Sequence, residues 1–168
     1  MDDVRNDREA RKPAILFLCL GNICRSPLAE GAARAAFAAA GIDATLDSAG
    51  TGDWHVGHPP DRRAQAEARR RGADIGGLRA RQLVPGDFRR FDLILAADDT
   101  NLRDALALAP GDATAELRLM LDLVPGRTGE SVADPYYGDD GGFAATWDDV
   151  SAVAAALVTA AASAESSG

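Results

Sequence analysis

Cys19-Leu20-Gly21-Asn22-Ile23-Cys24-Arg25-Ser26 is the stretch of sequence from which the fold can be worked out. A short apolar run, Ala14 to Leu18, precedes it and has the length and bulk of a buried strand. Pro27 follows it, at a position typical of the first turn of a helix, and alanine-rich sequence continues the helical pattern. The pattern therefore predicts a strand, a tight loop and the N-terminus of a helix.

This arrangement is typical of an anion-binding site. The backbone N–H groups of a tight loop can converge on one anion, and the helix N-terminus adds a partial positive charge. Gly21 and Asn22 tolerate the left-handed backbone that such a loop needs. The planar guanidinium of Arg25 can bind two phosphate oxygens at once. We therefore expect phosphate, or a phosphate-like anion such as vanadate, to bind within the loop.

Cys19 ends the predicted strand, where its sulfur would face the bound anion. Helix N-termini and nearby cations favour the thiolate form of cysteine. The predicted chemistry is attack of this sulfur on phosphorus, through a phosphocysteine intermediate. A buried structural cysteine is the alternative in a strand-to-helix turn, but the spacing from Cys19 to Arg25, with Gly-Asn between them, favours the nucleophile.

The loop resembles the phosphate-binding loop of the low-molecular-weight protein tyrosine phosphatases, in which five residues separate a cysteine from an arginine and a serine. The resemblance covers roughly residues 13–162 and implies a hydrolase that acts on tyrosine-phosphorylated proteins and needs no cofactor. It implies that Cys19 is the nucleophile and that Arg25 binds phosphate. The remaining residues that it assigns to the loop are Leu20, Gly21, Asn22, Ile23, Cys24 and Ser26. Ser26 is expected to bond to the Cys19 sulfur, and Ser48 to brace Asn22.

Asp134 is the predicted general acid, because the group that the thiolate expels must receive a proton. Pro135 fixes the backbone beside it, and Asp134-Pro135-Tyr136 resembles the acid loop of the same family. By that resemblance Asp134 also acts as the base toward the water that releases phosphate. An Asp-Pro pair alone could simply begin a turn.

Three aromatic residues, Trp54, Tyr136 and Tyr137, are predicted to wall the substrate pocket. A deep aromatic pocket favours phosphotyrosine, because phosphoserine is too short to bring its phosphate to the bottom. Ile23 also favours tyrosine, since related bacterial phosphatases that act on phosphoarginine tend to carry threonine there.

Two positions leave alternatives open. Cys24 is either a packed small apolar residue or a second thiol that forms a disulfide with oxidised Cys19 and protects it, as the resemblance implies. The family often braces its asparagine with a histidine near the end of the second helix. Arg71 takes that position here, and it either weakens the bracing or pairs with an acid.

Alternating strands and helices predict an α/β fold with parallel strands. The resemblance implies a three-layer sandwich whose four-stranded parallel sheet, in the order 2-1-3-4, is flanked by helices. The predicted strands are residues 14–19, 42–48, 91–96 and 115–121, and the predicted helices are residues 27–40, 61–71, 78–84, 100–109 and 143–162. Residues 1–12 are expected to be a flexible N-terminal extension, residues 13–162 the phosphatase domain, and residues 163–168 a frayed C-terminal tail.

Composition and net charge limit the partners, the compartment and the metal sites that we expect. The net charge of −8 argues against nucleic acid or an anionic membrane surface as a partner. Neither a secretory signal nor an apolar run long enough to span a bilayer is evident, so we expect a cytoplasmic protein. Two cysteines exclude a disulfide framework, and with the only histidines elsewhere we expect no metal site.

Three other functions remain to be weighed. An arsenate reductase would use the same loop and relay a disulfide to a further cysteine. No cysteine follows Cys24 in this chain, so only an arsenate reductase that is assisted by a thiol from another molecule stays open. A non-catalytic phosphoprotein-binding module would need neither Cys19 nor Asp134. A metal-dependent phosphatase would lose activity in EDTA.

Overall fold

The computed structural model describes residues 12–139 and 141–166. Four parallel strands form its centre: β1 (Ala14–Cys19), β2 (Thr45–Gly50), β3 (Leu93–Ala96) and β4 (Glu116–Leu119). Their order is β2-β1-β3-β4, as predicted. Cys19 pairs with Gly50 and Leu18 with Ala96, so the carboxyl ends of three neighbouring strands meet at one edge of the sheet.

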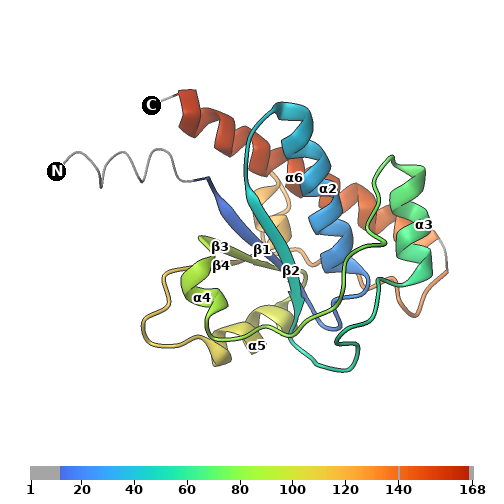
Figure 1. The fold of residues 1–168 in the computed structure, drawn as a ribbon, viewed down its shortest axis with the longest axis horizontal. Coiled ribbons are helices and arrows are strands. Elements are labelled where there is room, and N and C mark those ends of the chain that lie inside the picture. Colours follow the sequence, from blue (N-terminus) through green and yellow to red (C-terminus); the bar gives the residue numbers. More distant parts are fainter. Residues whose placement is uncertain (1–11, 140, 167–168) are drawn as a thin grey trace.

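Helices cover both faces of this sheet (Figure 1), which confirms the three-layer sandwich. One face carries α2 (Arg25–Ala40), α3 (Arg62–Arg70) and α6 (Gly141–Ser166), and the other carries α4 (Asp87–Arg90) and α5 (Asp99–Leu108). Successive side chains of a strand point to opposite faces. Phe17 of β1 therefore packs into the core beneath α2 and α6, while Leu18 packs with Phe88 and Ala105 on the other face.

The segment predicted as a helix, Leu78–Val84, is extended instead. The Ala80 N–H donates to the carbonyl of His58 at 2.9 Å, and the Leu83 N–H donates to that of Gly50 at 2.8 Å. Its backbone groups thus bond to residues distant in sequence, not to carbonyls one helical turn earlier. The prediction was wrong because the bonds that decide this conformation come from β2 and from the loop that follows it.

Helix α6 extends beyond the predicted residues 143–162 at both ends. The tail expected to fray from residue 163 is helical as far as Ser166. The last two residues of that tail, and residues 1–11 of the expected N-terminal extension, lie outside the described residues.

By length and composition alone, the apolar part of α6, Gly141–Ala164, could cross a membrane. This contradicts the expectation that no apolar run is long enough. Phe143, Val150 and Leu157, spaced seven residues apart on one face of the helix, are buried in the same core as β1 and α2. That face of α6 is therefore part of the protein core.

Candidate active site

The Cys19–Ser26 loop lies at the carboxyl edge of the sheet, between β1 and α2. Asn22 has a φ of 57°, the only positive φ among the non-glycine residues that the structure describes. Gly21, the other residue expected to tolerate a left-handed backbone, does not have a positive φ. A Cβ added to Gly50 would lie 2.7 Å from the carbonyl oxygen of Leu20 and 3.2 Å from the backbone nitrogen of Asn22. A glycine at the end of β2 thus lets the loop backbone pack closely against that strand.

Asn22 is held in this conformation by three hydrogen bonds. Its Nδ2 donates to Ser48 Oγ at 3.0 Å, as expected, and also to Ser26 Oγ at 2.8 Å, and its Oδ1 accepts the Arg81 backbone N–H at 3.0 Å. A left-handed non-glycine residue costs roughly 1–2 kcal/mol, and each bond contributes about 1 kcal/mol. The three bonds together are enough to offset the backbone strain.

The network continues to a buried acid that the sequence analysis did not single out. Ser48 Oγ donates to Glu30 Oε1 at 2.8 Å, and Arg34 Nε donates to Glu30 Oε2 at 2.8 Å. Only 1% of Glu30 is exposed. Burial raises the pKa of Glu30, and the hydrogen bonds from Ser48 and Arg34 oppose that rise without cancelling it.

Arg71, which the resemblance placed at the end of this network, bonds elsewhere. Its Nε donates to Glu67 at 2.8 Å, and its Nη1 lies 3.1 Å from a carboxylate oxygen of Asp148. Of the two alternatives, pairing with an acid is therefore confirmed. Glu30, which lies on α2 itself, extends the bracing of Asn22 in this protein.

The sulfur of Cys19 lies 3.0 Å from Ser26 Oγ, as predicted. Ser26 Oγ already accepts the Asn22 amide hydrogen, so its own proton is available to another acceptor. The competing acceptor, the carbonyl of Ala49, is 3.5 Å away. The shorter distance favours donation from Ser26 to the Cys19 sulfur.

Arg25 is buried and held on two sides. Its Nη1 lies 2.8 Å from Asp98 Oδ2 and donates to the carbonyl of Val132 at 3.0 Å, while its Nη2 lies 3.6 Å from Asp134 Oδ2. Asp98 also caps α5 by accepting the Asn101 N–H. No local pattern in the sequence links Asp98 to an arginine 73 positions earlier, so this contact becomes visible only in the fold.

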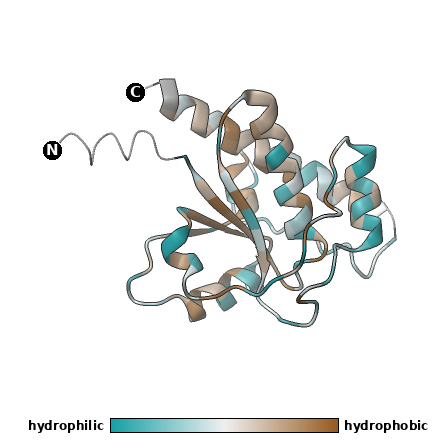
Figure 2. Cartoon of the chain, viewed as in Figure 1, coloured by the Kyte–Doolittle hydropathy of each residue, from teal (hydrophilic) through white to brown (hydrophobic). Residues whose placement is uncertain are grey.

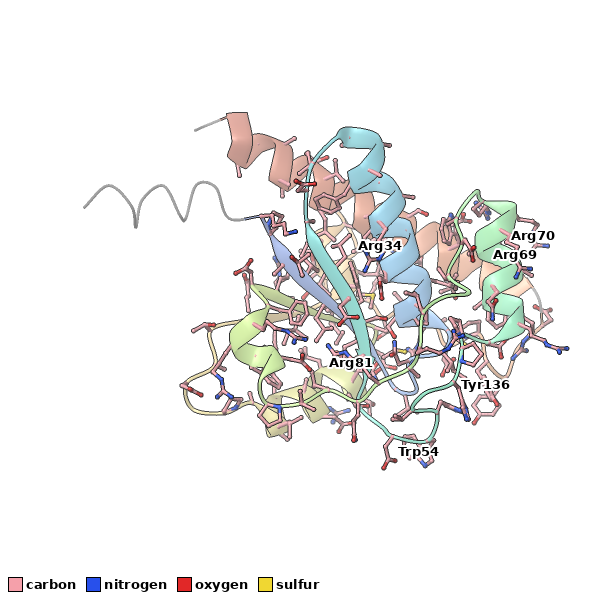
Figure 3. All side chains as sticks on the ribbon, viewed as in Figure 1. Arg34, Trp54, Arg69, Arg70, Arg81 and Tyr136 are labelled. Atoms are coloured by element: carbon pink, nitrogen blue, oxygen red, sulfur yellow. The ribbon has the colours of Figure 1, made fainter. Side chains whose placement is uncertain are left out.

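A pocket of about 410 Å³ opens above Cys19. Trp54, Tyr136 and Tyr137 line it, as predicted. Figure 3 shows Trp54 and Tyr136 on two separate loops. Its lining also includes His55, which the sequence analysis missed; the full set is Cys19, Leu20, Gly21, Ile23, Cys24, Arg25, Trp54, His55, Asp134, Tyr136 and Tyr137. The structure thus brings the three predicted catalytic residues into one cavity.

The second cysteine differs from the first in its contacts. Cys24 is buried, and burial raises its pKa, with the negative charges of Asp61, Cys19 and Asp134 acting in the same direction. Both cysteines are free thiols. Within residues 12–139 and 141–166, no three His, Cys, Asp or Glu side chains lie close enough together to hold a metal ion.

Residues 14–166 match the model of the low molecular weight phosphotyrosine protein phosphatases. The chain belongs to this family. A low molecular weight phosphotyrosine protein phosphatase of Schizosaccharomyces pombe is 42% identical over 132 residues, which cover 77% of this chain and 84% of that protein. The family's members are hydrolases, and so is this protein.

Solved structures agree on the fold. A protein tyrosine phosphatase from Entamoeba histolytica, with Hepes in its active site, superposes with a TM-score of 0.83 at 32% identity, over 88% of this chain and 96% of that one. A Drosophila arginine phosphatase superposes with a TM-score of 0.82 at 28% identity, over 87% of this chain and 96% of that one. Members of this fold are thus named for action on two different phosphorylated residues.

Proposed function

We propose that this phosphatase hydrolyses phosphotyrosine in proteins through a phosphocysteine intermediate. The observation that carries the proposal is that the Cys19 sulfur, the Arg25 guanidinium and the Asp134 carboxyl open into one pocket. A non-catalytic binding module would use the arginine but has no need of the other two. The loop and Arg25 hold the three outer phosphoryl oxygens, and this electrostatic term is usually the largest in phosphoryl transfer.

In the first step the Cys19 thiolate attacks phosphorus and forms an S–P bond, while the P–O ester bond breaks. Asp134 gives its proton to the departing phenol oxygen. In the second step Asp134 takes a proton from water, the water oxygen bonds to phosphorus, and the S–P bond breaks. The hydrogen bond from Ser26 to the sulfur stabilises the thiolate that leaves.

Asp98 and Val132 are proposed to keep Arg25 aimed at the phosphoryl group. Because both already bond to Nη1, the guanidinium does not have to reorganise during the reaction. The second nitrogen, Nη2, lies on the side of Asp134. Arg25 thus stands between one carboxylate that positions it and another that transfers protons.

The pocket favours an aromatic substrate. Trp54 and Tyr136 supply ring faces for a phenyl group, and Ile23 adds an apolar contact beside them. An arsenate reductase that relays its disulfide within the chain would need a third cysteine, which the sequence lacks. Phosphotyrosine is therefore the proposed substrate, and phosphoarginine is the alternative to be tested.

We also propose that Cys24 protects Cys19 from irreversible oxidation. A peroxide would oxidise the Cys19 thiolate to a sulfenic acid and be reduced to water. The Cys24 sulfur would then attack the oxidised sulfur, forming a disulfide and releasing water. Because both thiols are free and lie within one short loop, the protein is proposed to act in the cytoplasm, where they are kept reduced.

The substrate class is tested with a panel of peptides carrying phosphotyrosine, phosphoserine or phosphoarginine, each in EDTA. The phosphotyrosine peptide should be hydrolysed fastest, and Cys19→Ser should abolish its turnover. Asp134→Ala should lower kcat about 10²- to 10⁴-fold. Faster turnover of phosphoarginine, or hydrolysis that survives Cys19→Ser, would contradict the proposal.

A further inference from the structure

The segment that follows the Trp54 loop in the sequence is positively charged, whereas the chain as a whole is negatively charged. Residues 62–81 carry seven of the 18 lysines and arginines but only two acids, in a protein whose net charge is −8. Helix α3 accordingly stands out as hydrophilic in Figure 2. A local excess of one charge on an oppositely charged protein is typical of a site that attracts a charged partner.

Four of these seven arginines form ion pairs within the protein. Arg63 pairs with Asp61, Arg70 and Arg71 pair with Glu67, and Arg81 pairs with Asp47 and Asp87. The other three, Arg62, Arg69 and Arg79, are exposed, and within the described part of the chain none has a carboxylate at ion-pair distance. We call these three residues the basic strip.

The basic strip forms a continuous patch. Arg62 and Arg69 share one face of α3 with Gln65, because residues three and seven positions apart lie on the same side of a helix. Gln65 Oε1 lies 3.5 Å from Arg69 Nη2 and would lie 3.1 Å from a Cβ added to Gly76, so the turn at Gly76 packs on this face. Arg79 Nη1 then donates to the Gly76 carbonyl at 2.8 Å.

The patch adjoins the pocket through backbone pairing. Ala80, the residue after Arg79, donates to His58 at 2.9 Å and accepts from Gly57 at 2.8 Å. The His58 ring lies 5.9 Å from that of His55, which lines the pocket. The basic strip and the pocket rim are therefore neighbours on the surface.

A second connection comes from the other end of α3. Arg63, next to Arg62, donates to the backbone carbonyl of Tyr136 at 3.1 Å. Figure 3 shows Tyr136 between the Trp54 loop and the helix that carries Arg69.

One acid beside the strip reduces its positive charge. Asp74 accepts the Gly76 N–H at 2.9 Å.

We propose that the basic strip binds acidic residues that flank the phosphotyrosine of the substrate. This inference rests on the proposed phosphotyrosine phosphatase function and adds a preference for sequence around the phosphorylated residue. Arg62 and Arg69 are separated by about 10 Å along the helix axis, the reach of about three residues of an extended peptide. The strip therefore matches a run of aspartates or glutamates, and a single acid would use only part of it.

The test compares two phosphotyrosine peptides of equal length, one with acidic and one with neutral flanking residues. The readout is the ratio of their kcat/KM values. We expect the wild-type ratio to be roughly three- to tenfold and to fall as salt is added, because exposed charge pairs are individually weak and screened. In the triple variant Arg62→Gln, Arg69→Gln, Arg79→Gln the ratio should approach one.

Arg103→Gln is the matched control. Arg103 is exposed on α5, on the opposite face of the sheet, and it should leave the ratio as in wild type. A charge-reversed variant with glutamate at the three positions should prefer a peptide with basic flanks. Equal kcat/KM for the acidic and neutral peptides would overturn the docking surface alone, whereas no turnover of either peptide would overturn the proposed function itself.

Discussion

At the scale of single residues, the two sulfurs of the Cys19–Ser26 loop have different environments. The Cys19 sulfur lies 3.0 Å from Ser26 Oγ, while Cys24 is buried and feels the negative charges of Asp61 and Asp134. Burial raises the pKa of Cys24, so it remains a neutral thiol at neutral pH. Oxidants react with thiolates, so Cys19 is the sulfur that we expect to be oxidised first.

The Cys24→Ser variant tests this difference. After exposure to an excess of hydrogen peroxide, wild-type activity should return when dithiothreitol is added, because the disulfide is reducible and shields Cys19 from a second oxidation. The variant should recover little, because its oxidised Cys19 proceeds to the sulfinic acid. Activity recovery and intact mass are measured together. Equal recovery of the two proteins would show that Cys24 is only a packing residue.

The sequence could identify the residues whose roles are tied to local spacing. Cys19, Asn22 and Ser26 were all assigned to one loop, and the expected contacts of Ser26 with the Cys19 sulfur and of Ser48 with Asn22 are confirmed. Asp98 and Glu30 could not be assigned in this way. Their partners, Arg25 and Ser48, lie 73 and 18 positions away, and only the folded sheet brings them into contact.

At the scale of elements, three separate segments hold the loop. Helix α2 provides Glu30, β2 provides Ser48, and the extended segment after α3 provides the backbone N–H of Arg81. Glu30 is connected to Asn22 through Ser48, and its carboxyl group can gain or lose a proton. Its protonation should therefore affect the stability of the site.

Glu30→Gln is predicted to change the pH dependence of stability. The pKa of Glu30 is raised by burial, so its stabilising contribution is complete below the ordinary pKa of glutamate, about 4.3, and is lost as pH rises through the folded-state value. Glutamine has no such titration. The free energy of unfolding of the variant relative to wild type should therefore increase from about pH 4 to about pH 7.

Urea unfolding at a series of pH values measures this difference. Glu130→Gln, at an exposed acid far along the chain, is the control, and its difference from wild type should show no comparable rise. A difference for Glu30→Gln that stays constant over the same range would mean that Glu30 has the same pKa in the folded and unfolded states.

Elements with a strong local pattern were predictable. The apolar run of β1 is confirmed as a strand, and the helix predicted at residues 61–71 is confirmed as α3, Arg62–Arg70. The segment from Leu78 to Val84 was not, since its conformation follows from bonds to Gly50 and His58. Segments that lack a pattern of their own take their structure from neighbours that the sequence does not identify.

At the scale of the whole molecule, the parallel sheet brings the chemistry together. Because β1 lies between β2 and β3, its carboxyl end meets residues from both neighbours. Ser48 of β2 thus lies on one side of the loop, and Asp98, just after β3, lies on the other. The strand order followed from the family resemblance, whereas the alternation of strands and helices was readable from the sequence directly.

The overall charge alone was misleading about the surface. A net charge of −8 predicts repulsion of acidic partners, yet the basic strip lies beside the pocket. Taken alone, the run Arg69-Arg70-Arg71 at the end of α3 is typical of a solvated helix face. Its meaning depends on which arginines are neutralised, and that becomes clear only when ion pairs across the fold are known.

Cys19 is proposed to carry the phosphoryl group during the reaction. In Asp134→Ala with para-nitrophenyl phosphate, whose leaving group needs little protonation, the second step should be slowed more than the first. Acid quenching followed by digestion and mass spectrometry should then find one phosphoryl group on Cys19, and Cys24 in the same peptide should be unmodified. A phosphoryl group on any other residue, or steady turnover with none bound to the protein, would contradict the account.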